Sequence, residues 1–474
     1  TRSSGAATRR SSSLRARFGR TVLNRRAALL VPPLLAVAVV VAVQAWPRPV
    51  AAPINNTPIV EGADGLTDVR PPGEVIAVAG VDTSDTDRRI AFWQARIAAN
   101  ARDDISWTYL GDLFEIKGRQ TGDVANYTSA RDAYGTALDI APGSAAAAIG
   151  AARIASTLHD FLGAQAGATQ VLAADPKATG ALAILFDASL ELGELDTAQH
   201  ALTLLENRSQ TPAVTGRAAR LAFIRGDTQG ALELSRQAVT DSTDAGDPAS
   251  SLAFYNFAHA EYALFAGDLD AAEAAYEASL AALPGYPLAL YGEGRVAYAR
   301  GDVEHAIALL EAATAALPRP DMVAYLGDLY AVAGRTADAI RQYDTVDFIH
   351  GLAAQGGAKV YDREYIGFLA DHGRDSVTAI DLAASELVAR KDVYGYDALA
   401  WAQHAAGNDA DALTNARLSL ASGTQDARLL IHAGLIELAN GLTADGQAHI
   451  TAGLVLNPSF SPLVVEAARV QVAP

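Results

Sequence analysis

The chain of 474 residues contains no cysteine, one methionine, and few aromatic residues, which make up 7% of the composition. The absence of cysteine excludes disulfides, zinc–thiolate sites, iron–sulfur clusters and cysteine nucleophiles. A formal net charge of −17, from 37 basic and 54 acidic residues, argues against nucleic acid as the main partner. Alanine is abundant and 39 glycines are spread along the chain, which favours many close helix contacts over one large core.

Motifs of catalysis are missing as well. The sequence has no His-Glu-x-x-His pair for zinc, no Gly-x-Ser-x-Gly elbow, no Ser-x-x-Lys pair and no phosphate loop ending in Gly-Lys-Ser or Gly-Lys-Thr. His372, His404 and His432 are isolated histidines, for which packing or helix capping is favoured over metal ligation. The sequence therefore predicts no catalytic residue, no cofactor and no metal site, and we interpret the protein as a non-enzyme.

The first 46 residues differ from the rest. Residues 1–26 contain eight arginines and no acidic residue, and the next 20 residues (27–46, AALLVPPLLAVAVVVAVQAW) carry no charge. A helix of that length would cross a hydrocarbon core of about 30 Å. The basic flank predicts a cytoplasmic tail at 1–26 and an extracytoplasmic location for everything after the apolar run. The run is either a retained single-pass transmembrane anchor, which we favour, or an export signal cleaved before Trp46, which would make the protein secreted.

Beyond the apolar run, only 29 basic residues face all 54 acidic ones, so residues 47–474 carry a formal charge of −25. Such a surface favours cationic partners, although solubility of an alanine-rich fold is the simpler explanation. Residues 47–81 are rich in proline, glycine, valine and asparagine and show no helical periodicity. They are predicted to form an extended linker ahead of a folded domain at 82–474.

The strongest signal in the folded domain is a repeat. Glycines that are followed five residues later by a small residue recur, mostly 33 or 34 residues apart, at Gly193, Gly226, Gly267, Gly301, Gly334, Gly407 and Gly441. Each glycine lies between two apolar runs, where it would end one helix in the left-handed conformation while Asp or Thr caps the next. The pattern predicts stacked helix pairs, with a lead-in helix near 87–100 and a terminal capping helix near 462–472.

Units of this length with these landmarks resemble the tetratricopeptide repeat (TPR). The first unit carries the TPR pattern, with about seven residues inserted in its turn, at Trp107, Leu110, Gly111, Phe114, Ala130, Tyr134, Ala137 and Pro142. A later unit matches it again at Leu326, Gly327, Tyr330, Ala339 and Tyr343. The segments FLADHG (368–373), YDALAWA (396–402) and NPSFSP (457–462) look like those of exported bacterial TPR proteins.

The resemblance covers residues 102–459 and implies an all-α, right-handed α-solenoid of about ten TPR-like repeats. Units two and eight depart most from the pattern, and they are either softer joints or places where the repeat register is misassigned. Members of this family are generally described as repeat scaffolds without a defined reaction, so the resemblance implies binding and not catalysis.

In this architecture the first helix of each unit lines an inner groove. The groove positions give a set of candidate partner-binding residues: Phe254, Phe257, Glu261, Tyr291, Arg295, Tyr298, Trp401 and His404. Inward aromatics beside a few charges suit an extended peptide or a helix. Packing within the stack is the competing interpretation. Glu261 and Arg295 can also pair with each other, which at an exposed position would contribute about 0–1 kcal/mol.

The predicted function is therefore an extracytoplasmic, membrane-tethered protein–protein interaction scaffold that binds a protein or peptide in its groove. Contact with the membrane is expected through the N-terminal helix only. Two alternatives are a non-catalytic recruiting subunit of an envelope enzyme complex and a structural spacer. No motif identifies the partner.

Overall fold

The structure is a computed structural model, and it describes residues 81–355 and 360–473. The predicted cytoplasmic tail (1–26), the predicted anchor or signal (27–46) and all but the last residue of the predicted linker lie outside the described residues. Among the helices that are described, none is both long and apolar enough to cross a bilayer.

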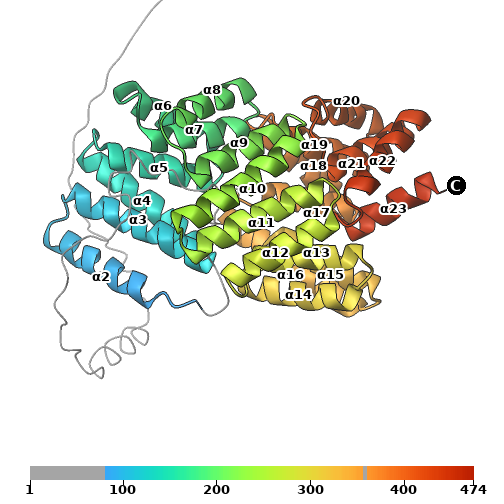
Figure 1. Cartoon of the computed structure of the whole chain (residues 1–474), viewed down its shortest axis with the longest axis horizontal. Helices are drawn as coiled ribbons and strands as arrows, with labels where there is room; N and C mark the ends of the chain where they lie inside the picture. Colours follow the sequence, from blue (N-terminus) through green and yellow to red (C-terminus); the bar gives the residue numbers. More distant parts are fainter. Residues whose placement is uncertain (1–80, 356–359, 474) are drawn as a thin grey trace, which may run out of the picture. The chain divides into compact units, whose positions relative to one another are not determined.

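The described part of the chain is all-helical, with 22 α-helices and no strand (Figure 1). The helices are α2 Ser84–Ala99, α3 Asp104–Thr121, α4 Val124–Ile140, α5 Ala145–Thr157, α6 Phe161–Ala174, α7 Thr179–Glu191, α8 Leu195–Glu206, α9 Pro212–Ile224, α10 Thr228–Ala245, α11 Ala249–Phe265, α12 Leu269–Ala282, α13 Pro287–Ala299, α14 Val303–Ala316, α15 Pro320–Val332, α16 Thr336–Gln355, α17 Asp362–Asp371, α18 Ser376–Leu387, α19 Val393–Ala405, α20 Asp409–Ser419, α21 Ala427–Ala439, α22 Thr443–Leu456 and α23 Pro462–Val472.

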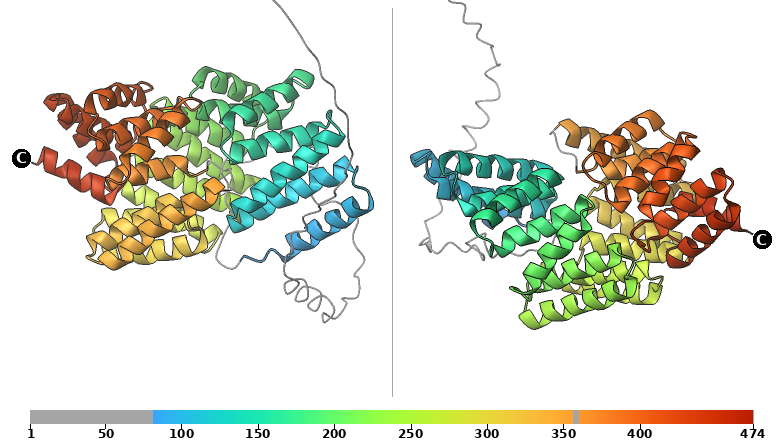
Figure 2. Two further views of the ribbon diagram at one scale, coloured as in Figure 1. Left: turned by 180° about the vertical axis from the view of Figure 1, so that it is seen from behind. Right: turned by 90° about the horizontal axis from the view of Figure 1, so that it is seen from above.

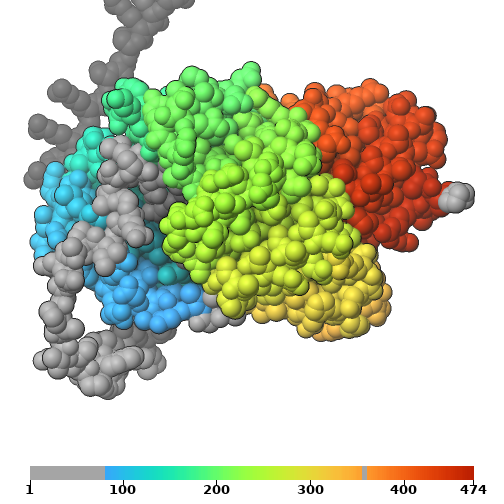
Figure 3. All heavy atoms as spheres, in the orientation of Figure 1, coloured from blue at the N-terminus to red at the C-terminus, as the bar shows by residue number. Residues whose placement is uncertain are grey.

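Consecutive helices pack in pairs, from α3 with α4 to α21 with α22, and each pair packs on the next. These are ten pairs, which confirms the predicted repeated helical packing, and Figure 2 shows them stacked in chain order. In the space-filling view the surfaces of successive pairs merge, from green (α8–α11) into yellow (α13–α15) (Figure 3). Buried apolar side chains form a series of local clusters along the stack, because each repeat contacts mainly its neighbours.

The turn chemistry explains where the helices end. All seven repeat glycines have φ between 75° and 88°, the left-handed conformation in which a side chain would be strained. The aspartate that follows several of them caps the next helix: Asp227 accepts the amide N–H of Gly230, and Asp268 accepts that of Ala271. The boundaries were thus readable from the sequence, and α23 occupies the predicted range 462–472.

Two local expectations need correction. The lead-in helix begins at Ser84, three residues before the predicted start. The residues thought to be inserted in the first turn instead lengthen the helices, since α3 continues to Thr121 and α4 begins at Val124. Gly118 lies inside α3 against the ring of Tyr127, and this close contact joins the two lengthened helices.

Units two and eight, where the repeat pattern is weakest, both form helix pairs. Unit two is α5 and α6, with 13 and 14 residues. Unit eight begins with the short α17 of ten residues, which follows a 20-residue α16 and the residues 356–359 that are not described. The loss of landmarks in unit eight therefore coincides with a change in helix length.

Repeats far apart in the sequence also meet. The hydroxyl of Thr424, before α21, donates to the carbonyl oxygen of Ile224 at the end of α9, at 2.6 Å. The hydroxyl of Tyr325 in α15 donates to the carbonyl oxygen of Ser459, just before α23, also at 2.6 Å. These contacts bring later repeats back against earlier ones, so that the stack encloses part of its own inner face.

Candidate functional site

A cavity of about 710 Å³ lies where later repeats approach earlier ones. One side is formed by the first helices of the five N-terminal repeats, α3, α5, α7, α9 and α11. The other side comes from residues near the starts of α15, α17 and α19, including Arg319, Tyr361, Glu364 and Tyr394. The cavity is therefore a product of the superhelical path, because no single repeat contains it.

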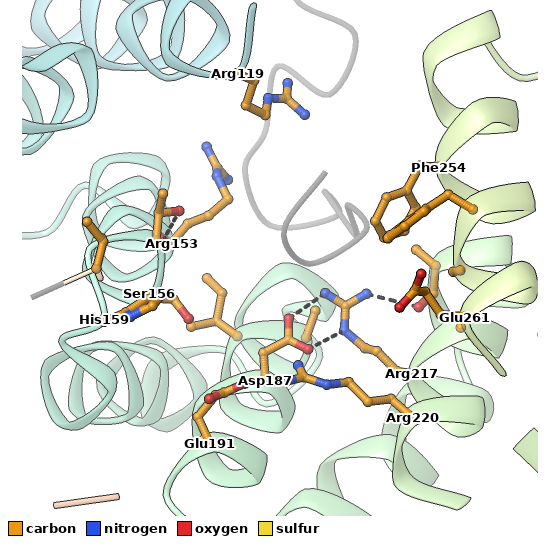
Figure 4. A pocket seen from close by; sticks show the side chains of 18 of the residues that line it. Arg119, Arg153, Ser156, His159, Asp187, Glu191, Arg217, Arg220, Phe254 and Glu261 are labelled. Carbon is orange, nitrogen blue, oxygen red and sulfur yellow. Dashed lines mark hydrogen bonds and ion pairs between the residues drawn. The ribbon is translucent and has the colours of Figure 1, made fainter. Parts of the chain in front are cut away.

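Most charges on the wall are paired across neighbouring repeats (Figure 4). Arg153 of α5 donates through Nε to both carboxylate oxygens of Glu115 in α3, at 2.9 and 3.0 Å. Arg217 of α9 holds Asp187 of α7 through two nitrogens, with Nη2–Oδ2 at 2.6 Å and Nε–Oδ1 at 3.1 Å. Paired carboxylates and guanidiniums of this kind fix adjacent first helices to each other and give the wall a rigid polar pattern.

Glu191, at the end of α7, is a wall carboxylate held by two arginines. It pairs with Arg220 of α9 and with Arg390, which lies between α18 and α19. Burial alone would raise the pKa of Glu191, but the charges of Arg220 and Arg390 outweigh burial and hold that pKa well below its usual range. Glu191 is therefore ionised and ties an early repeat to a late one.

Aromatic side chains supply the apolar part of the wall. The ring of Phe223 in α9 stacks on Phe265 of α11 at 4.7 Å and lies 5.6 Å from the ring of Tyr262. Phe254 and Phe257, one and two turns into α11, are half-buried and also line the cavity. Burial raises the pKa of Tyr262 to about 12, so its hydroxyl stays neutral and can donate a hydrogen bond.

Glu364, in the first turn of α17, differs from the other carboxylates of the wall. Its Oε2 is buried, and no donor within the described residues bonds to it. Its Oε1 lies 4.0 Å from Nη2 of Arg319, beyond hydrogen-bonding distance. Burial raises the pKa of Glu364, with a further contribution from the nearby charge of Asp321.

Three of the eight residues proposed from the sequence lie on this wall: Phe254, Phe257 and Glu261. Glu261 also binds protein groups behind the wall, accepting from the hydroxyl of Tyr276 and from Arg295. The Glu261–Arg295 pair therefore forms, as considered above, but with side chains 19% and 10% exposed it is largely buried and not a surface pair. Tyr291 packs against the guanidinium of Arg295, 4.6 Å from ring centre to Cζ.

The other three proposed residues lie elsewhere and pack between later repeats. Tyr298 meets Tyr325 edge to face at 6.3 Å. Trp401 is buried, stacks on His432 at 4.0 Å and donates through Nε1 to Asp371 at 2.6 Å. His404 lies beside Asp409, with Nδ1 2.5 Å from Oδ1. The eight positions thus do not form one continuous site, and their role in partner binding stays a prediction.

Several wall residues escaped the sequence reasoning, among them Arg153, Asp187, Arg217 and Glu364. A usable signal was present for some of them, because Arg153 is the only charged residue in the alanine-rich α5. A lone charge on an apolar helix predicts a buried partner on a neighbouring element. Within residues 81–355 and 360–473, no three histidine, aspartate or glutamate side chains are placed to hold a metal ion.

Comparison with known proteins agrees with this architecture. Residues 257–319 and 291–347, which run from α11 to α16, match the family model described as tetratricopeptide repeat. Residues 257–347 thus match the tetratricopeptide repeat. The match covers residues of the pairs α11–α12, α13–α14 and α15–α16. No curated protein sequence matches the chain.

Three of the solved structures that match the chain show the range of these likenesses. The type IV pilus biogenesis factor PilW is 18% identical, with 43% of this chain and 92% of PilW covered and a TM-score of 0.37. Human IFIT1, solved as a dimer with PPP-AAAA, is 13% identical over 80% of this chain and 95% of its own, with a TM-score of 0.44. The APC/C hetero-tetramer Cut9-Hcn1 is 14% identical over 82% and 94%, with a TM-score of 0.30. At these values the likenesses carry no inference about a partner or ligand.

Proposed function

We propose that this TPR protein is an extracytoplasmic, membrane-tethered scaffold that holds a short segment of a partner protein inside its cavity. The observation that carries the proposal is the cavity itself, whose wall combines half-buried aromatic side chains with fixed charge pairs. Apolar anchors with a few placed polar groups are what peptide recognition requires. A volume of about 710 Å³ suits a short extended segment better than a whole helix.

Selection from a library of random 12-residue peptides tests the binding part of this proposal, with the full chain in detergent as bait. Selected peptides should bind the wild type and should bind at least about tenfold more weakly to a Phe254→Ala/Phe257→Ala variant, since both lost rings lie on the wall. Phe348→Ala serves as the matched control, because Phe348 on α16 is 67% exposed and does not line the cavity. Circular dichroism and urea unfolding establish that each variant is folded.

Two results would contradict the binding proposal. If no peptide is selected, a structural spacer becomes the better interpretation of the stack. If the cavity variant and the control bind equally well, the binding surface lies outside the cavity.

Tethering and location rest on the sequence of residues 1–46 and need a separate test. The full chain should fractionate with membranes and resist extraction by high salt, whereas deletion of residues 27–46 should release it, because the apolar run is the proposed anchor. Protease is added to cells whose outer layer is permeabilised but whose cytoplasmic membrane is intact, and it should digest residues 82–474. A full chain that is soluble without detergent would contradict the anchor, and protection from protease would contradict the extracytoplasmic location.

A further inference from the structure

Glu364 is the carboxylate of the cavity wall to which no arginine of the described residues donates a hydrogen bond. Five arginines and five carboxylates line the cavity. Glu115, Asp187, Glu191 and Glu261 each accept hydrogen bonds from a protein arginine. Glu364 is the fifth carboxylate, and its buried Oε2 has no donor among the described residues. Because the Glu364 side chain is 25% exposed and no arginine of the described residues donates a hydrogen bond to it, its carboxylate can accept from a cation that enters the cavity.

The neighbouring arginine does not fill this role. Arg319 donates to both carboxylate oxygens of Asp321, at 3.0 and 3.1 Å, and this bidentate geometry holds its guanidinium 4.0 Å from Glu364. On the cavity side, Tyr361 lies three residues before Glu364 and also lines the wall. A cation that enters the cavity would thus meet a carboxylate and an aromatic ring from the same short segment, a combination that binds ammonium and guanidinium groups.

We infer that the cavity recognises a basic residue, lysine or arginine, of the bound peptide through the carboxylate of Glu364. The inference rests on the proposed peptide-binding function and adds the chemical class of the ligand. The basic group pairs with the carboxylate of Glu364, whose side chain is 25% exposed, while the aliphatic stem of the same residue lies along the aromatic part of the wall. The formal charge of −25 on residues 47–474 attracts such a peptide from a distance.

Three matched peptide pools test the inference. Each peptide has 11 residues, random except for the central position, which is arginine in one pool, its uncharged analogue citrulline in the second and glutamate in the third. The full chain in detergent is the bait, at about 150 mM salt so that contributions from distant surface charges are screened. The wild type should retain the arginine pool at least about tenfold better than the citrulline pool, as expected for a charge-assisted hydrogen bond inside a cavity.

The variant Glu364→Gln should lose this preference and retain the arginine and citrulline pools equally. Glu304→Gln removes the same charge from an exposed position on α14 and should leave the preference unchanged. Urea unfolding separates binding from structure, because a carboxylate to which no arginine donates a hydrogen bond contributes little to the stability of the ligand-free fold. Glu364→Gln should therefore unfold at the same or a higher urea concentration than the wild type.

The outcomes distinguish recognition of a basic residue by Glu364 from peptide binding by the cavity. Equal retention of the arginine and citrulline pools by the wild type would overturn the role of Glu364 while leaving peptide binding in place. A marked loss of stability in Glu364→Gln would also overturn it, since the carboxylate would then be bound by protein donors. If no pool is retained at all, the proposed function itself fails.

Discussion

Arg390 and Glu191, 199 positions apart in the sequence, form an ion pair in which both side chains are largely buried. Glu191 ends the first helix of the third repeat, and Arg390 lies between the eighth and ninth repeats. Arg390 also donates to Glu386 at 2.7 Å and lies over the ring of Phe161, 4.7 Å from its centre. A single arginine therefore connects two parts of the stack that are far apart along the chain, next to the cavity.

Replacing Arg390 by alanine should loosen this connection. The change leaves two buried carboxylates, Glu191 and Glu386, with fewer cations, so we expect a loss of about 3 kcal/mol or more in the free energy of unfolding. Urea unfolding followed by circular dichroism measures the loss. As control, Arg300→Ala removes an arginine that pairs with the exposed Asp270 of the preceding repeat, and it should have a much smaller effect. Equal effects of the two variants would show that the long-range pair is no stronger than a surface pair.

A second prediction concerns Gly226, which has φ of 83° and lies against the backbone of a distant loop. A Cβ atom at Gly226 would lie 2.4 Å from the carbonyl oxygen of Gly423, so Gly226→Ala should separate these segments. Gly301 has φ of 88° but open space around its Cα, so Gly301→Ala should show only the backbone strain, about 1 kcal/mol. Small-angle X-ray scattering should show a larger radius of gyration for Gly226→Ala alone. If both variants keep the wild-type radius, the contact does not hold the stack closed.

The pH dependence of stability should differ between His372 and His159. Burial lowers the pKa of His372, but its hydrogen bond to Asp328, with Nε2–Oδ1 at 2.8 Å, outweighs burial and raises the pKa above the ordinary 6.5. The stabilisation by His372 is therefore complete below pH 6.5 and is lost as the pH rises through the raised value. Burial, with a smaller contribution from the charge of Arg390, lowers the pKa of His159 to about 4. The stabilisation by neutral His159 is therefore complete above pH 6.5 and is lost as the pH falls from 6.5 through about 4.

Urea unfolding of His372→Gln and His159→Gln at about pH 6 and about pH 9 checks these opposite signs. His372→Gln should destabilise the protein more at the lower pH, because the protonated histidine is then present in the wild type. His159→Gln should destabilise the protein less at the lower pH than at the higher pH, because the wild type itself loses stability there. A pH-independent effect of His372→Gln would contradict a raised pKa in the folded state.

The Glu261–Arg295 pair should be strongly coupled. Because both side chains are largely buried and share the hydroxyl of Tyr276, we expect a coupling free energy of about 1–3 kcal/mol in a double-mutant cycle with Glu261→Gln and Arg295→Met. The exposed pair Glu233–Arg236 on α10 provides the control cycle and should show no measurable coupling. Similar coupling in both cycles would argue that burial does not strengthen the pair.

The repeated architecture was predictable because its determinants are local. A glycine that stops one helix, an aspartate that caps the next and an apolar stripe all act within a few residues, as Gly226 and Asp227 illustrate. Because these local signals recur about every 34 residues, the sequence was sufficient to predict about ten helix pairs and the ends of α23. The first turn was misjudged because the extra residues continue two helices, and tertiary contact between Gly118 and Tyr127 supports that continuation.

The sequence by itself determined the helix pairs and their order, whereas only the tertiary structure decided which groove positions face open space. Phe254 and Trp401 were both predicted at groove positions of their repeats, yet Phe254 lines the cavity while Trp401 is buried against His432. The difference arises because later repeats return to earlier ones through pairs such as Arg390 and Glu191. Small rotations between successive repeats add up to this closure, and their sum is set by packing along the whole stack, not by any local pattern.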